Sequence, residues 1–278
     1  MLKRIITSIV AMAVLLPVLI FSDTVIFPIA ISVIMLICLY EIFKCTGSEK
    51  KISVVLPLYL FGVIAPFLLD YLTTAQFALI AFIAAALYTI YLFFLIVWSH
   101  GKKPFGETVA VYILALYIMT ALCSIVYVHN FEPYGKYIYL LIFLGAWITD
   151  IFAYFTGYFI GKHKLIEDVS PKKTIEGSIG VIVFCAVSFV VFGLVVDKWF
   201  GQNANIVFLI ISGGILSVVS QIGDLIMSVI KRHYKIKDFG KIFPGHGGML
   251  DRFDSIMAVS LGLAAICMFV TLTGIHLM

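Results

Sequence analysis

Charged side chains are scarce in this sequence: Asp, Glu, Lys and Arg make up 12% of its 278 residues, while hydrophobic residues make up 63%. The mean hydropathy of +1.13 lies far above that of soluble domains. Apolar runs of about 20 residues, long enough to cross a bilayer, recur from one end of the sequence to the other. The scarcity of charge therefore excludes a soluble globular domain and predicts an integral membrane protein.

Cysteine is too sparse and too scattered to build a disulfide framework or a zinc site. The five cysteines show no paired ligand spacing, and most fall within apolar runs: Cys38, Cys45, Cys123, Cys185 and Cys267. We expect them to be packing residues. The sequence also contains no internal repeat and no low-complexity segment.

The apolar runs predict an all-α polytopic membrane protein with about nine transmembrane helices. These cover residues 5–22, 25–43, 52–69, 75–98, 108–128, 137–160, 180–200, 205–230 and 256–276. The first run resembles a signal peptide, but it lacks a small-residue cleavage site, so we expect it to be retained. Residues 1–278 are predicted to form a single transmembrane domain, with scaffold helices in 1–135 and catalytic helices and cytoplasmic loops in 136–278.

The distribution of Lys and Arg predicts the orientation in the membrane. If the N-terminus is cytoplasmic and the nine spans alternate, 17 of the 19 basic residues lie inside and only Lys136 and Lys198 lie outside. The C-terminus is then outside, in what we expect to be the bacterial inner membrane. The net charge of +4 follows from this topology and does not indicate nucleic-acid binding. Contact with anionic lipid is the alternative role of the basic loops 44–51 and 99–103.

Two carboxylates, Asp150 and Asp224, lie within predicted spans, where a charge costs a few kcal/mol and is usually functional. The helical stripe that contains Asp224 comprises Ser217, Gln221, Asp224, Ser228 and Lys231. It predicts the wall of a polar cleft that opens to the cytoplasm. The alternative is a helix–helix interface held by hydrogen bonds.

The helix face of Asp150 leaves two interpretations open. Asp150 either has a functional role or is the buried partner of a Lys or Tyr. The same helix carries Ala153, Gly157 and Gly161 at spacings of four, and this pattern of small residues predicts close helix packing.

The segment 231–254 is the one polar island in the chain, with six basic side chains, three carboxylates, two histidines and four glycines. Asp251 lies just before the last predicted span. If the island folds back, Asp251 meets Asp224 at the mouth of the cleft. Paired Asp oxygens suit Mg²⁺, which is commonly held by one or two carboxylates and substrate phosphates. A second cation is left open.

The island also has the groups that bind phosphates. The turn Pro244–Gly248 contains three glycines, which can bring backbone N–H groups close to phosphate oxygens. The counter-charge that a triphosphate needs is supplied by Lys231, Arg232, Lys237 and Arg252. The loop Ser170–Gly177, with Lys172 and Lys173, has the same character on a smaller scale. Each feature alone fits a solvated loop, but together with Asp224 they predict a phosphate and metal site.

The pattern from Ser228 to Asp254 resembles the signature of CDP-diacylglycerol synthases, the phosphatidate cytidylyltransferases. The resemblance rests on Lys231-Arg232, Lys237-Asp238, Gly240, Pro244-Gly245-His246-Gly247-Gly248 and Asp251-Arg252-Phe253-Asp254. The segments Gln221–Asp224 and Ser170–Gly177 resemble the regions that precede it in the family. The N-terminal half agrees only in being hydrophobic.

The resemblance implies an enzyme that converts CTP and phosphatidate to CDP-diacylglycerol and pyrophosphate with Mg²⁺. For this chemistry we assign Asp224 and Asp251 as metal ligands, and Lys231, Arg232, Lys237 and Arg252 as phosphate-binding residues. Further contacts to nucleotide or metal ligands are expected from Asp238, His246, Asp254, Lys172, Lys173, Gly245, Gly247 and Gly248. The expected partners are CTP, phosphatidate and membrane phospholipids, with no nucleic acid; a homodimer is left open.

Three alternatives fit parts of the pattern. A transporter for an anionic solute would also use intramembrane Asp and a basic vestibule, but it predicts polar chemistry in both halves of the chain. A CDP-alcohol phosphotransferase needs more Asp residues on adjacent helices than Asp251 and Asp254 provide. A purely structural membrane protein does not explain Asp224 together with the island.

Overall fold

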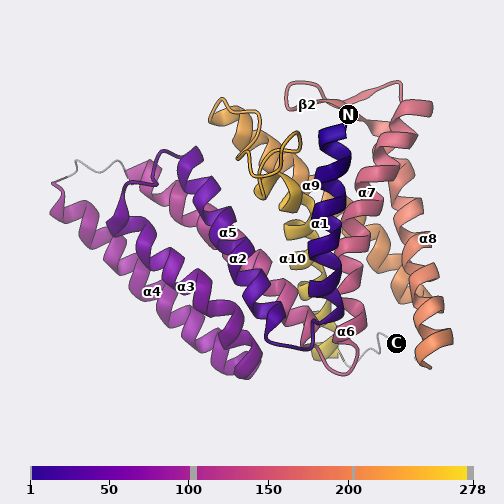
Figure 1. The fold of residues 1–278 in the computed structure, drawn as a ribbon, viewed down its shortest axis with the longest axis horizontal. Coiled ribbons are helices and arrows are strands. Elements are labelled where there is room, and N and C mark those ends of the chain that lie inside the picture. Colours follow the sequence, from indigo (N-terminus) through magenta and orange to yellow (C-terminus); the bar gives the residue numbers. More distant parts are fainter. Residues whose placement is uncertain (1, 101–104, 202–203, 274–278) are drawn as a thin grey trace. The chain divides into compact units, whose positions relative to one another are not determined.

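The computed structural model describes residues 2–100, 105–201 and 204–273, and only the backbone at residues 2–6 and 8. Helices dominate it (Figure 1): α1 (Leu2–Ile20), α2 (Ile26–Cys45), α3 (Ile52–Tyr71), α4 (Thr74–Trp98), α5 (Phe105–His129), α6 (Gly135–Ile138), α7 (Leu140–Phe159), α8 (Ile175–Phe200), α9 (Ile206–His233) and α10 (Leu250–Thr273). A two-stranded antiparallel hairpin, β1 (Lys164–Ile166) and β2 (Ser170–Thr174), joins α7 to α8. The predicted all-α polytopic architecture is confirmed.

Eight of the helices in the described part of the chain are long and apolar enough to cross a membrane, with α6 and α7 counted as one span. They correspond to the second through ninth predicted spans. The first predicted span falls on α1, whose described apolar stretch Ile9–Ile20 is shorter than a span. Lys102 and Lys103, which entered the prediction of orientation, lie outside the described residues.

The last helix begins earlier than the hydrophobicity indicates. The sequence predicts a span from residue 256, but α10 begins at Leu250, so Asp251 and Asp254 lie in its first turns and not before it. The prediction was wrong because the polar start of this helix is stabilised by a distant side chain, Glu41, which accepts hydrogen bonds from the Met249 and Leu250 N–H groups.

The helices group into two compact units. The first comprises Met1–Tyr127 with Asp238–Asp251, and the second comprises Val128–Lys237 with Arg252–Met278. In the first unit α2 lies against α3, and Gly62 allows the close approach, since a Cβ there would be 3.0 Å from Leu39 Cδ1. Helix α4 joins α3 through a hydrogen bond from the Tyr88 hydroxyl to the Val54 carbonyl, at 2.6 Å.

The second unit is built on α7, α8 and α9, which contact one another in pairs. Small residues set the spacing: a Cβ at Gly177 of α8 would lie 2.8 Å from the Ala153 carbonyl oxygen and 3.2 Å from Gly157 Cα of α7. The close packing predicted for Ala153 and Gly157 is thus confirmed. Stacked rings of Phe152 and Phe184 extend the same interface.

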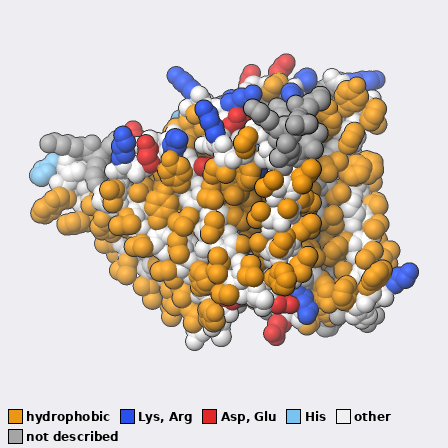
Figure 2. Space-filling view, in the orientation of Figure 1, with side chains coloured by type: hydrophobic (Ala, Val, Ile, Leu, Met, Phe, Trp, Pro, Cys, Tyr) orange, Lys and Arg blue, Asp and Glu red, His pale blue; other side chains and the backbone are white. Residues whose placement is uncertain are grey.

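Apolar side chains cover the outer faces of the helices. Figure 2 shows hydrophobic residues over most of the visible face. In α4, Val97 is 76% exposed and Trp98 is 73% exposed. Exposed apolar side chains of this size would make a soluble protein prone to aggregation. Such a surface is expected where lipid is the surrounding solvent.

Two adjacent glycines of α9 test whether helix packing limits stability. A Cβ at Gly213 would lie 2.9 Å from Ala186 Cα, whereas at Gly214 the nearest atom is Ile182 Cγ2 at 3.7 Å. Alanine favours a helix over glycine by about 1 kcal/mol at either position. We therefore expect Gly213→Ala to lower the melting temperature in detergent, because overpacking costs about 1–3 kcal/mol. Gly214→Ala should leave it unchanged or raise it, and equal effects of the two would contradict this packing.

Candidate active site

Three carboxylates from three helices approach one another in the second unit. Asp150 of α7 and Asp254 of α10 each interact electrostatically with Asp224 of α9 and with each other. Ser255 lies among them: its hydroxyl donates to Asp150 Oδ1 at 3.4 Å, and its backbone N–H donates to Asp254 Oδ1 at 2.8 Å. The sequence predicted functional roles for Asp224 and Asp254 and left two interpretations open for Asp150, and the structure brings the three together.

The hairpin supplies a cation to this cluster. Lys173 on β2 forms an ion pair with Asp224, and each side chain is only about a fifth to a quarter exposed, at 20% and 24%. Lys173 is held in place because the next residue, Thr174, caps α8 by accepting a hydrogen bond from the Gly177 N–H at 3.1 Å. Lys172, its neighbour, is exposed. The upstream loop and the predicted metal ligand Asp224 therefore belong to one site.

Further basic residues surround the carboxylates. Lys231 interacts electrostatically with Asp254, and Arg252 does so with Asp150. Lys231 is half-buried at the end of α9, while Arg252, Arg232 and Lys237 are exposed. Asp150 also interacts electrostatically with Lys173, so both interpretations of Asp150, a functional role and the partner of a Lys or Tyr, stay open.

The polar stripe of α9 has a buried inner part and a more accessible outer part, and the predicted cleft stays a prediction. Its inner part is a helix–helix interface, since Ser217 and Gln221 are buried and the Gln221 amide donates to the Ser178 and Ser217 carbonyls, each at 3.3 Å. Its outer part, with Asp224 and Lys231, is accessible. The inner half of the stripe thus holds α9 against α8, and the outer half carries the charged side chains Asp224 and Lys231.

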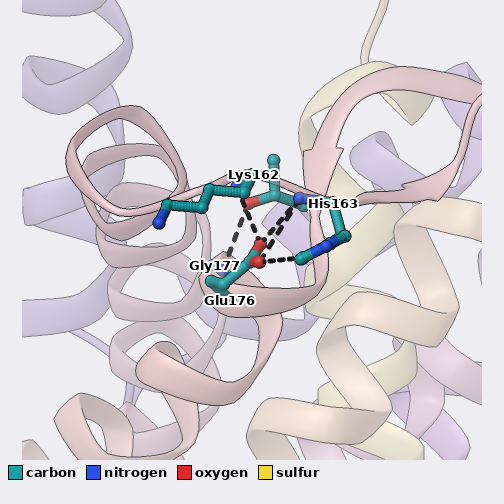
Figure 3. A network of polar contacts seen from close by, with 5 residues as sticks. Lys162, His163, Glu176 and Gly177 are labelled. Carbon is teal, nitrogen blue, oxygen red and sulfur yellow. Dashed lines mark hydrogen bonds and ion pairs between the residues drawn. The ribbon is translucent and has the colours of Figure 1, made fainter.

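A single carboxylate fixes the hairpin to the start of α8. Glu176 accepts the backbone N–H groups of Lys162 and His163, at 3.1 and 3.2 Å, and lies 2.6 Å from His163 Nδ1 (Figure 3). Figure 3 shows the Glu176 carboxylate directed toward the chain that leaves α7. This network joins the two ends of the loop that carries Lys173.

In the first unit Asp251 organises the glycine-rich loop. Its Oδ2 accepts the N–H groups of Phe239 at 2.8 Å and of Gly248 at 2.9 Å, and the side chain is 7% exposed. A Cβ at Gly247 would lie 2.8 Å from the same oxygen, so only glycine fits there. Asp251 was predicted as a metal ligand. The structure shows that one of its oxygens holds the loop, and the metal role stays a prediction.

The turn of this loop presents two glycines with positive φ, Gly245 at 80° and Gly247 at 89°. The N–H of His246 is used inside the turn, where it donates to the Phe243 carbonyl at 2.9 Å. Gly247 pairs with Phe243 across the turn, since its carbonyl accepts the Phe243 N–H at 2.9 Å. The role of Gly245 and Gly247 in binding phosphate stays a prediction.

Other predicted residues lie as follows. Asp238 is exposed at the start of the loop, and His246 is half-buried in it. The predicted approach of Asp251 to Asp224 joins residues of the two different units and stays a prediction. In the described ranges no group of three or more His, Cys, Asp or Glu side chains has the arrangement of a metal site.

The chain was then compared with known proteins. The model of the cytidylyltransferase family matches residues 2–270. The chain belongs to this family. Similar curated relatives are named phosphatidate cytidylyltransferase: one from Staphylococcus haemolyticus is 48% identical over 120 residues, 43% of this chain and 45% of the relative. One from Staphylococcus epidermidis is 47% identical over 124 residues, 45% of this chain and 46% of the relative. The chain thus spans under half the length of the curated relatives it matches.

For this family member, sequence reasoning missed one residue of the site. Glu41, in the half expected to be chemically quiet, is 2% exposed and accepts hydrogen bonds from the Met249 and Leu250 N–H groups. A signal was available, because Glu41 is the one acidic residue in the apolar run Ile26–Cys45. The rule that singled out Asp150 and Asp224 applies to it equally.

The Glu176 network predicts how the hairpin responds to mutation. Glu176→Gln removes a charged acceptor from three contacts, so the loop from Lys162 to Thr174 should open more often. We expect faster tryptic cleavage after Lys164 or Lys172 in detergent, read by mass spectrometry. Glu167→Gln, an exposed change in the same hairpin, should cleave at the wild-type rate. Unchanged cleavage in Glu176→Gln would show that the network does not hold the loop.

Proposed function

We propose that the protein transfers the cytidylyl group of CTP to phosphatidate, giving CDP-diacylglycerol and pyrophosphate for phospholipid synthesis. The observation that carries the proposal is the cluster of Asp150, Asp224 and Asp254 beside Lys173, Lys231 and Arg252, on helices apolar enough to span a membrane. Family membership and the names of the relatives support the same reaction.

Cytidylyl transfer depends more on neutralising the charge of the phosphates than on transferring a proton. An oxygen of the phosphatidate phosphate attacks the α-phosphorus of CTP, a new P–O bond forms, and the bond to the β-phosphate breaks to release pyrophosphate. A phosphomonoester has a second pKa of about 6, so it is mostly a dianion at neutral pH and needs no strong general base. The protein then has to align two polyanions and offset their repulsion.

The basic residues are placed for this task. Lys173 and Lys231 lie beside the carboxylate cluster, and Arg252 carries a guanidinium that can hold a phosphate through two hydrogen bonds. We assign the exposed Arg232 and Lys237 to the departing pyrophosphate. The N–H groups of Gly245 and Gly247 would bind phosphate oxygens in the turn.

The donor set also fits Mg²⁺. The carboxylates offer only oxygen ligands, and Mg²⁺ is usually held by one or two carboxylates with substrate phosphates and water, not by a complete protein cage. Asp224 and Asp251 would hold the ion, with Asp150 and Asp254 near Asp224 for a second cation. When bound, the metal would offset charge on the phosphates.

The orientation that the basic residues predict would give the site access to both substrates. With the N-terminus in the cytoplasm, the hairpin and the loop 238–249 face the compartment that supplies CTP. Phosphatidate would reach Asp224 from the bilayer, since α9 is a candidate membrane span. We expect this membrane to be the bacterial inner membrane.

Turnover is the direct test. Purified protein with labelled CTP and phosphatidate should form a CDP-lipid in Mg²⁺ and none after chelation with EDTA. Asp224→Asn should lower turnover about 100-fold or more, because a carboxylate that would hold the charge-neutralising metal is removed. Asp197→Asn, at the opposite end of α8 from the hairpin, should keep wild-type turnover.

Each outcome separates one part of the proposal from the rest. No product from folded protein would overturn the reaction, and product in EDTA would overturn the metal. Near-normal turnover by Asp224→Asn would remove this carboxylate from the site. Release of CMP from a CDP-alcohol, with no turnover of CTP, would favour the phosphotransferase alternative.

Membrane orientation has its own test. A cysteine in place of Lys198, predicted outside, should react with an impermeant maleimide in intact cells. A cysteine in place of Lys241, predicted inside, should react only after permeabilisation. The unmodified chain is the control, because its five cysteines are buried or half-buried. The reverse pattern of labelling would contradict the predicted topology.

A further inference from the structure

Glu41 is the most buried carboxylate of the first unit, and it accepts hydrogen bonds from the end of the glycine-rich loop. It lies on α2 and is 2% exposed. Its Oε1 accepts the Met249 N–H at 3.0 Å, and its Oε2 accepts the Leu250 N–H at 2.8 Å. Both oxygens are thus used by the two residues that open α10, although these lie more than 200 positions away in the sequence.

Two glycines of the loop lie so close to this carboxylate that a side chain would not fit. A Cβ at Gly240 or at Gly248 would collide with Glu41 Oε1, and at Gly248 it would also lie 2.6 Å from Oε2. The loop therefore contacts Glu41 in two ways. Met249 and Leu250 donate hydrogen bonds to it, and the backbone at Gly240 and Gly248 lies directly against it. Glycine is required at these positions by the carboxylate, and not by backbone conformation, since neither has a positive φ.

The contact serves the helix that carries Asp251. The first N–H groups of a helix have no partner within the helix, and a negative charge at this end also matches the helix dipole. Leu250 is the first residue of α10 and Asp251 is the second. Holding the Leu250 N–H therefore fixes where the helix starts and the direction in which Asp251 leaves it. Asp251 in turn holds the N–H groups of Phe239 and Gly248.

We propose that Glu41 is a positioning residue, which through the Met249 and Leu250 N–H groups holds the glycine-rich loop and Asp251 in the geometry that receives the nucleotide phosphates. The inference rests on the cytidylyltransferase function proposed above. It assigns a role in the site to the N-terminal half of the chain, from a residue that touches no substrate.

Kinetics of Glu41→Gln and Glu41→Ala test the role. The glutamine keeps the shape but turns an NH₂ group toward a backbone N–H, and the alanine removes both acceptors. We expect the KM for CTP to rise about tenfold or more in each variant, while the KM for phosphatidate stays within about twofold. Glu107→Gln, which removes an exposed carboxylate of the same unit, should change neither. If only the active fraction falls and both KM values stay at wild type, Glu41 supports the fold alone and the proposal is wrong.

A double-mutant cycle isolates the contact. Gly240→Ala places a methyl group against the Glu41 carboxylate, so alone it should impair CTP use. In Glu41→Ala the space is vacated, so the added methyl should cost little more. We expect the loss in the double variant to be at least about tenfold smaller than the product of the two single losses. Losses that simply multiply would contradict direct contact.

A readout without substrate separates this proposal from the function on which it rests. Tryptic cleavage after Lys241, within the loop, should be at least about fivefold faster in Glu41→Ala, while cleavage after Lys172 in the second unit stays at the wild-type rate. This result would stand even if wild-type protein had no turnover, in which case the function fails and the contact does not. Equal cleavage after Lys241 in both proteins would overturn the positioning role.

Discussion

A carboxylate placed on a membrane-spanning helix must find hydrogen-bond donors or a cation, because hydrocarbon offers neither. The polar parts of this protein are arranged by that requirement. Glu41 takes two N–H groups at the start of α10, Asp251 takes two more in the loop before it, and Asp224 takes the ammonium group of Lys173. Each of these three carboxylates is thus tied to a segment outside its own helix. The loops acquire fixed shapes because the carboxylates need partners.

The same pairing explains why the candidate site can be both charged and ordered. A basic loop on a membrane protein is normally a solvated segment with many conformations. Here Glu176 closes the hairpin, Thr174 caps α8, and Lys173, the residue before Thr174, pairs with Asp224. Positive charge is held close to three carboxylates, so that a polyanion and a divalent cation would find opposite charges already in place.

Local and distant information contributed differently to the prediction from sequence. Hydrophobic runs identified eight spans, because burial in lipid depends on each segment alone. The polar stripe could be placed on one helix, α9, because helical spacing is a local property, while its role as the wall of a cleft stays a prediction. The start of α10 could not be predicted locally, because its capping group comes from Glu41 on another helix. The sequence predicted that Lys173 contributes to the site. It could not predict the pairing of Lys173 with Asp224, because this depends on the hairpin, which has no periodic pattern in the sequence.

The most direct test is an experimental structure of the protein with Mg²⁺ and a non-hydrolysable CTP analogue. The account predicts the nucleotide phosphates beside Lys173 and Lys231, with the cation bound by Asp224. A nucleotide bound away from Asp224, with no cation at its carboxylate, would contradict the claim that these membrane-embedded carboxylates form the site of cytidylyl transfer.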